Sequence, residues 1–342
     1  MLGTLLFVAQ LAHAACGACT PGARSYLEWA AATAPTPHPE PAYRFEADVH
    51  EVFSRWVAER PGVVRPFRVG QSGEDRPIWG FRLADPAAPV RGRLLVLATL
   101  HALEWVPTEV AVAFAEDFAA QPIAGVEVVV IPTLNVDGRA LVEADLRADR
   151  AVYRRGNAAR VDLNRDFGVH RQSDAVWKAL LPSRYTVSPG PLSQPETRAL
   201  DALAARERFD AAVSLHAFGG FFYYPWAGRF ARAPGHAELH RLARVMQDAM
   251  GAHAYRPRQL SRWGFFFRGL GMELDHLHHQ YGTWAFLVET TRSGLATPAD
   301  LGVPFRMYNP RDPARHAREG VRYLRALAAE VASGRVVARP AE

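Results

Sequence analysis

Short, almost uninterrupted apolar runs separated by segments of helical spacing are the feature that most constrains this fold. The runs Arg93–Leu100 and Val126–Pro132 are rich in leucine and valine. Such runs are typical of strands that are covered on both faces. Further strands are predicted at Pro77–Leu83, Ala211–Leu215, Gly220–Tyr224 and Thr283–Val288, and helices at Val49–Val57, Thr108–Phe118, Gln194–Arg206, His236–Met250 and Pro313–Val331. The alternation predicts a single α/β domain with a central mixed, mostly buried β-sheet flanked by helices.

The two ends of the chain differ in composition from its middle. Near the start, an apolar stretch too short to span a membrane precedes Ala12-His13-Ala14, a small-x-small pattern of the kind that signal peptidase cleaves. We expect a secreted or periplasmic protein, or a cytoplasmic one if this segment is not a signal peptide. The expected divisions are a signal peptide at 1–15, an Ala/Pro-rich linker at 16–42, a catalytic domain at 43–333 and a disordered tail at 334–342.

Cysteine usage and charge limit the partners of the chain. Cys16 and Cys19 are the two cysteines, and they fit a small disulfide, a lipid anchor on Cys16 or two idle thiols. The formal net charge is +5, and Lys178 is the one lysine, so arginine carries almost all the positive charge. No basic stripe is interleaved with aromatics, which excludes a typical nucleic-acid surface. We expect a monomer with no nucleic-acid partner and no stable membrane insertion.

Histidine and glutamate follow two of the predicted strands. His101 and Glu104 come directly after the run that ends at Leu100, and His216 closes the strand that begins at Ala211. Two imidazoles and one carboxylate form a ligand set that catalytic zinc accepts, with a fourth position left for water. Taken singly, the His101–Glu104 pair fits chance spacing, and His216 fits a buried core histidine.

Two further groups of polar residues call for a chemical explanation. Asn157–Phe167, preceded by Arg154 and Arg155, is dense in donors and charges but has no helical face. Arginine presents a planar fork that binds a carboxylate through two hydrogen bonds. Glu289 closes a predicted apolar strand, where a buried carboxylate needs a function or a nearby cation.

Four further motifs occur in a fixed order with these residues. They are Ser72-Gly73-Glu74-Asp75-Arg76-Pro77, Asn135-Val136-Asp137-Gly138, Val161-Asp162-Leu163-Asn164-Arg165 and Gly190-Pro191-Leu192-Ser193-Gln194-Pro195-Glu196-Thr197. With the His-x-x-Glu pair, the distant histidine and the late glutamate, they make the sequence from about Tyr43 to Leu327 resemble the carboxypeptidase A-like zinc metallocarboxypeptidases. The resemblance implies that family's fold and one Zn²⁺ per chain.

The resemblance also implies a role for each matching residue. His101, Glu104 and His216 would bind zinc, and Asp162 would orient a ligand histidine from behind. Glu289 would be the general base toward the water that zinc activates, and it would then protonate the leaving amine.

Substrate recognition follows from the same resemblance. Asn164 and Arg165 would hold the terminal carboxylate of a peptide substrate, so that hydrolysis falls on the last peptide bond. Arg154 would stabilise the developing oxyanion, with Arg155 as the alternative for this role.

The specificity pocket departs from the family pattern. An alignment without gaps back from Glu289 puts Leu274 at the pocket floor, which favours an apolar or aromatic C-terminal residue. The same alignment puts Phe267 where the family has a pocket-closing tyrosine. Leu103 stands where the digestive enzymes carry an arginine. Glu273, if it pointed inward, would receive an ammonium group instead.

Other functions stay open on this sequence. A murein-peptide amidase that cleaves between D-glutamate and diaminopimelate keeps the zinc site and uses Glu273 for the amine. An aspartoacylase-like deacylase is disfavoured by the longer chain and by the Gly190–Thr197 motif. An inactive peptide-binding module is disfavoured because all three ligands and Glu289 are present. His276, His278 and His279 are interpreted as surface or pocket-rim residues.

Overall fold

The computed structural model of the chain describes residues 20–175, 187–264, 267–292 and 297–340. The expected signal peptide and both cysteines, Cys16 and Cys19, lie outside the described residues. Within the described ranges, no helix combines the length and the apolar character that crossing a bilayer requires.

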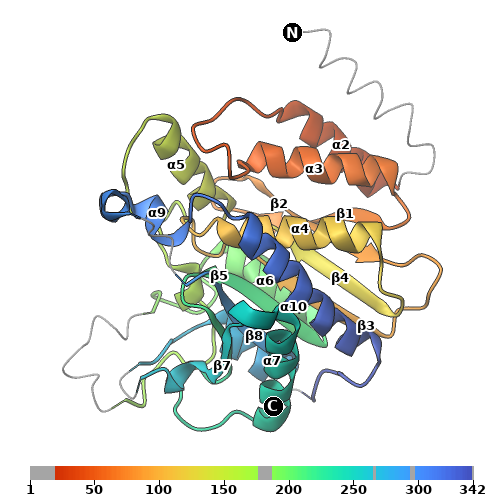
Figure 1. Cartoon of the computed structure of the whole chain (residues 1–342), viewed down its shortest axis with the longest axis vertical. Coiled ribbons are helices and arrows are strands. Elements are labelled where there is room, and N and C mark those ends of the chain that lie inside the picture. Colours follow the sequence, from red (N-terminus) through yellow and green to blue (C-terminus); the bar gives the residue numbers. More distant parts are fainter. Residues whose placement is uncertain (1–19, 176–186, 265–266, 293–296, 341–342) are drawn as a thin grey trace.

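A mixed sheet of eight strands forms the centre of the described chain, in the order β1-β2-β4-β3-β5-β8-β6-β7 (Figure 1). Strands β4, β3, β5 and β8 run parallel, whereas β1, β2 and β6 each pair antiparallel with a neighbour. The bounds are β1 Val64–Gln71, β2 Pro77–Ala84, β3 Gly92–Leu97, β4 Val126–Ile131, β5 Ala211–Ala217, β6 Phe221–Tyr224, β7 Arg256–Gln259 and β8 Trp284–Thr290. The predicted fold class is therefore confirmed.

Helices cover both faces of this sheet. One face carries α2 (Pro21–Ala32), α3 (Glu46–Glu59), α4 (Val106–Ala120), α7 (His236–Met250) and α10 (Ala314–Ala332), and the other carries α6 (Pro195–Glu207) and α8 (Glu273–Tyr281). The remaining helices are α5 (Val136–Arg147) and α9 (Pro304–Tyr308), and short 3-10 helices occur at Leu163–Arg165, Gly251–His253, Leu260–Arg262 and Pro298–Gly302.

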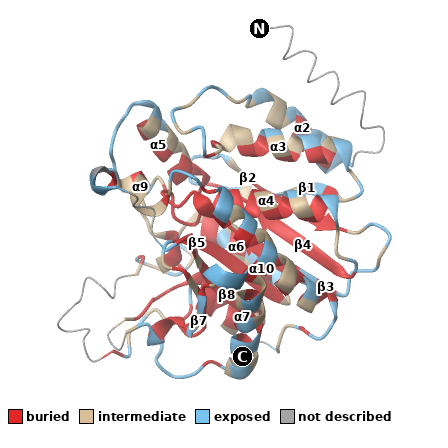
Figure 2. Cartoon of the chain, viewed as in Figure 1, coloured by how far each residue is buried: buried red, intermediate tan, exposed pale blue. Residues whose placement is uncertain are grey.

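The apolar strands bury residues on both sides, as the continuous runs require. Leu94 and Val96 of β3 pack with α4 and α10, whereas Leu95 and Leu97 pack with α6 in a separate core. Figure 2 shows these central strands as almost wholly buried. Because alternate side chains of a strand point to opposite faces, one strand serves both cores.

The expected linker is wrong over residues 21–32, which form α2. Thr20 caps this helix by accepting a hydrogen bond from the backbone of Ala23 at 3.3 Å. Tyr26 is fully buried and meets the ring of Phe81 edge-on, with the centroids 5.2 Å apart. The Ala/Pro-rich composition concealed one aromatic residue that reaches the core, and the α/β unit accordingly includes this helix.

The expected disordered tail is also wrong over its described part. Val336 is buried, and the backbone N–H of Arg339 donates to the carbonyl of Gly282 at 2.9 Å. The indole of Trp284 donates to the carbonyl of Val337 at 2.9 Å. These contacts tie the segment to the start of β8.

Candidate active site

Three side chains meet at the carboxyl ends of the parallel strands β3 and β5. Nδ1 of His101 lies 2.7 Å from Oε1 of Glu104, and Nδ1 of His216 lies 3.1 Å from Oε2 of the same carboxylate. The two Nδ1 atoms are 3.1 Å apart. Among the described residues this is the one group whose atoms converge as metal ligands do. The carboxyl ends of neighbouring parallel strands share one edge, which is where α/β sheets bind ligands.

The donor set fits zinc. Two imidazole nitrogens and one carboxylate are a common catalytic zinc triad, and all three side chains are buried. Burial alone would raise the pKa of Glu104, but His101 and His216 hold that pKa well below its ordinary value. Glu104 is therefore ionised, as a metal ligand must be.

Each histidine of the cluster has a carboxylate behind it. Nε2 of His101 lies 3.1 Å from Asp162, as the family resemblance led us to expect. Nε2 of His216 lies 3.3 Å from Oε1 of Glu273. Burial lowers the pKa of His216, but Glu104 and Glu273 outweigh burial and raise it to about 10.

The motifs around Ser72 and Asn135 connect segments of the site through hydrogen bonds. The side chain of Asn135 donates to the carbonyl of Leu100 at 3.0 Å and accepts from Gly138, which joins α5 to the segment before His101. Asp137 accepts from the hydroxyl of Ser72 at 2.6 Å and from the Arg76 guanidinium at 2.7 Å. These motifs support the site without entering it.

A second tie holds the segment that carries Asn164 and Arg165. The buried carboxylate of Asp166 accepts hydrogen bonds from the backbone and hydroxyl of Ser193, from the backbone of Gln194 and from the hydroxyl of Thr197. The start of α6 is thereby fixed to the turn at Leu163–Arg165. This explains why the Gly190–Thr197 motif accompanies the Asn-Arg pair.

The structure places Arg155, rather than Arg154, beside the metal cluster. Nε of Arg155 donates to Asp162 at 2.8 Å, and its Nη1 lies 3.5 Å from Glu104. Arg154 instead pairs with Asp145 on α5. The expectation for Arg154 is corrected because neighbouring residues of an extended segment point to opposite sides.

Glu289 lies next to the cluster on the adjacent strand. Its Cα pairs with that of His216 in the parallel register of β5 and β8. Burial, followed by the negative charge of Glu104, raises the pKa of Glu289 to about 8. A divalent cation bound by His101, Glu104 and His216 would oppose both effects, since a nearby positive charge favours the ionised carboxylate.

A cavity of about 390 Å³ joins these groups. Its polar lining includes Arg155, Asn164, Arg165, Glu289 and Arg292 together with His101 and His216. Its apolar lining includes Phe221, Leu260, Trp263, Phe267, Met272 and Leu287. Charged and aromatic side chains thus line one cavity.

The pocket residues predicted from the gapless alignment are partly wrong. Phe267 does line the cavity, but Leu274 is buried in the core against α6 and β8 and does not. Met272, two residues earlier, takes the expected place. Glu273 is fully buried against His216 and lies outside the cavity lining, which leaves it poorly placed to receive a substrate amine.

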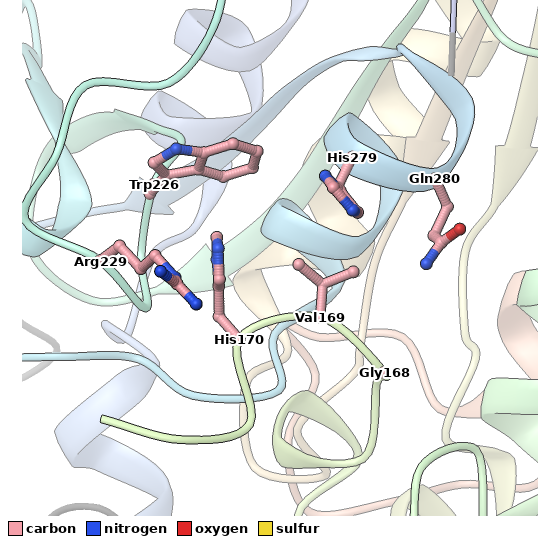
Figure 3. A pocket seen from close by; sticks show the side chains of 7 residues that line it. All are labelled: Gly168, Val169, His170, Trp226, Arg229, His279 and Gln280. Carbon is pink, nitrogen blue, oxygen red and sulfur yellow. The ribbon is translucent and has the colours of Figure 1, made fainter. Parts of the chain in front are cut away.

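A second recess of about 440 Å³ lies on another side of α8 (Figure 3). His170, Trp226 and Arg229 face His279 and Gln280 across it, and none of these residues lines the catalytic cavity. His279 lines this recess, which agrees with its interpretation as a pocket-rim residue. That interpretation is wrong for the other two histidines of the helix, since His276 and His278 are buried and lie within hydrogen-bond distance of Asp201 and of backbone carbonyls.

Comparisons with known proteins agree with this geometry. Carboxypeptidase O of Bos taurus is 23% identical over 286 residues, covering 77% of this chain and 66% of that protein. Carboxypeptidase A6 of Mus musculus is 24% identical over 268 residues, covering 72% of this chain and 60% of that protein. The matched part is thus less than two thirds of either relative.

Solved structures agree on the fold. The carboxypeptidase A of Helicoverpa armigera superposes with a TM-score of 0.69 at 17% identity, covering 92% of this chain and 80% of that one. Bovine thrombin-activatable fibrinolysis inhibitor, in complex with tick carboxypeptidase inhibitor, superposes with a TM-score of 0.69 at 20% identity, covering 85% of this chain and 98% of that one. A family model described as zinc carboxypeptidase matches residues 49–295, well over half of the sequence. The chain therefore belongs to the zinc carboxypeptidase family.

Proposed function

We propose that the chain is a zinc-dependent metallocarboxypeptidase, which hydrolyses the C-terminal peptide bond of peptides and releases an apolar or aromatic residue. The observation that carries this proposal is that one cavity is lined by His101 and His216 of the cluster, by Asn164 and Arg165, and by apolar side chains. One zinc ion per chain is proposed for the cluster.

Arg165 and Asn164 are the proposed grip for the substrate's terminal carboxylate. Both line the cavity, and Arg165 also donates to the backbone carbonyl of Asn164 at 2.6 Å. The side-chain oxygen of Asn164 accepts from the backbone of Glu273 at 3.1 Å, which fixes the amide. A planar guanidinium held this way can bind a carboxylate through two hydrogen bonds.

Glu289 and Arg155 are the proposed catalytic groups. Zinc held by the cluster would supply Lewis-acid chemistry, polarising the peptide carbonyl and acidifying water. Glu289 would take a proton from the attacking water and deliver it to the leaving amine, so that its carboxylate is restored after each turnover. The guanidinium of Arg155, held by Asp162, would face the oxyanion that develops on the carbonyl.

The apolar wall supports a preference for aromatic and aliphatic C-terminal residues. Phe221, Trp263 and Met272 offer apolar surface, and burying a side chain such as leucine or phenylalanine against it gains about 1.5–3 kcal/mol. The acidic residue nearest this wall in the cavity lining is Glu289, which is needed for catalysis. A basic C-terminal residue would therefore lack a matching charge.

Hydrolysis of N-blocked dipeptides ending in Phe, Leu, Arg, Lys and Glu would test the proposal. We expect release of Phe and Leu that a zinc chelator abolishes and added zinc restores. Activity on Arg and Lys alone would contradict the proposed pocket. If no dipeptide of the panel is hydrolysed while zinc is bound and purified muropeptides are cleaved, the chain is a murein-peptide amidase and not a carboxypeptidase.

A further inference from the structure

Glu273 is a fully buried carboxylate at the start of α8 that the proposed reaction does not use. Its side chain is 0% exposed, and its Oε1 lies 3.3 Å from Nε2 of His216. Neither oxygen has a hydrogen-bond partner among the described residues, so the contact with His216 is an ion pair. Burying an ionised carboxylate is costly unless its charge is matched. The group that Glu273 faces should therefore account for its presence.

The carboxylates behind His101 and His216 differ in how their negative charge is compensated. Asp162, behind His101, also accepts from the guanidinium of Arg155 at 2.8 Å and from the backbone of Asn164 at 2.9 Å. Glu273 forms no such bonds, and His216 is its one ion-pair partner among the described residues. The charge of Asp162 is thus shared with hydrogen-bond donors, whereas the one side chain that Glu273 meets as an ion pair among the described residues is the His216 imidazole.

We propose that Glu273 is a positioning residue for the metal, whose carboxylate faces the Nε2–H of His216, keeps the proton on that nitrogen and leaves Nδ1 free to bind the ion. This inference rests on the proposed zinc site. A carboxylate behind a ligand histidine fixes the tautomer and the ring orientation and makes the imidazole a stronger donor. With a divalent ion bound at Nδ1, the His216 ring would carry positive charge toward Glu273 and offset the burial of its carboxylate.

Ser214 offers the competing explanation. Its hydroxyl oxygen lies 3.0 Å from the same Nε2 of His216, so it could accept the proton in place of the carboxylate. The two candidates differ in charge, because a hydroxyl fixes the ring without making it a more basic ligand. Separate substitutions of Glu273 and Ser214 therefore show which of the two side chains supports zinc binding.

The test is zinc affinity, measured by competition with a chromophoric chelator, for the full chain and three variants. Glu273→Gln keeps the size of the side chain and removes its charge. Removing an outer partner of a metal ligand typically weakens binding about 10- to 100-fold, and we expect a loss in that range. Co²⁺ substituted for zinc should show altered visible absorption bands in this variant.

Asp275→Asn is the matched control on the same helix. Asp275 is also fully buried, but it contacts His170 and the backbone of Ala227 and Gly228 instead of His216. We expect its zinc affinity to match wild type, and Ser214→Ala to lose much less than Glu273→Gln. If Glu273→Gln does not fold, Glu273→Asp keeps the charge but shortens its reach, and it should also weaken zinc binding.

Two results separate the ways in which these ideas can fail. If wild type binds zinc and Glu273→Gln binds it equally well, or if Ser214→Ala carries the loss, the role of Glu273 is wrong while the proposed function stands. If wild type itself binds no zinc, the proposed function fails and the inference with it.

Discussion

Two charged clusters lie at opposite edges of the sheet, one near the starts of β3 and β4 and the other at the carboxyl ends of β3, β5 and β8, and they differ in how completely their charges are matched. At the starting ends, the buried Glu127 is held by Arg65, Arg82 and Arg93 at 3.0, 3.0 and 3.4 Å. At the carboxyl ends, Oε2 of Glu289 is buried without a hydrogen-bond partner among the described residues. Saturated ion pairs stabilise a fold, whereas charges left unsatisfied mark a place built for something that binds.

The largest expected effect is a loss of activity from a substitution in the cluster at the carboxyl ends of the strands. Glu289→Gln should lower kcat by about 100- to 10,000-fold, because it removes the group that accepts and returns the proton. Zinc affinity and unfolding temperature should stay close to wild type. Steady-state kinetics on a blocked dipeptide, with chelator competition for zinc, would measure both.

Glu127→Gln is the control for that substitution at the other end of the sheet. It should leave kcat unchanged and lower the free energy of unfolding by about 1–3 kcal/mol, as expected when a buried charged hydrogen-bond network is weakened. A fall in kcat for this variant equal to that of Glu289→Gln would erase the distinction between the clusters.

A second comparison sets two neighbouring arginines against each other. Arg155→Gln should lower kcat roughly 100- to 1,000-fold, the cost of removing one donor to a developing oxyanion. Arg154→Gln should remain close to wild type, since that side chain pairs with Asp145. The reverse order of effects would restore Arg154 to the site, and kcat and KM for both variants decide it.

Glu143 tests the comparison of the two clusters further, because the charge of its carboxylate is also incompletely compensated although it lies outside the cavity. Burial, only partly opposed by Arg139, raises its pKa to about 7. Since this pKa lies above the unfolded value, wild type holds the favourable protonated form at low pH and loses that stabilisation as pH rises through about 7.

Glu143→Gln should therefore raise the free energy of unfolding at pH 8 by an amount on the order of 1–2 kcal/mol, and change it little at pH 4.5. The substituted amide oxygen can still accept from the backbone of Glu46, which donates to Oε1 of Glu143 at 2.6 Å. Urea unfolding of both proteins across that pH range measures the difference. A benefit of equal size at both pH values would show that ionisation is not its cause.

The central strands, and the convergence of three side chains that could hold a metal ion, were predictable from the sequence because local patterns determine them. A continuous apolar run encodes a strand covered on both faces, and His101, Glu104 and His216 stand beside such runs. Edge strand β1 carries Arg65 and Arg68 among its apolar residues and was missed, since an edge strand with one solvated side has no such run.

The errors arise where tertiary contacts decide what local spacing cannot. The sequence favours Arg154 for the oxyanion role, but Asp145 on α5 pairs with Arg154 and Asp162 pairs with Arg155, and these two carboxylates decide which arginine reaches the cavity. Leu274 was assigned to the pocket by counting back from Glu289 across α8. Because that helix turns as it advances, the count does not reveal that Met272 faces the cavity and Leu274 the core.

The parallel register that aligns His216 with Glu289 makes catalysis a reporter of correct folding. A slip of one residue between β5 and β8 would turn Glu289 to the opposite face of the sheet, away from the ligands. Such a molecule could still be compact and could still hold a metal through His101, Glu104 and His216, yet it would not turn over. In a refolded preparation, the turnover rate per bound zinc would therefore measure the fraction of molecules in which β5 and β8 pair in the native register.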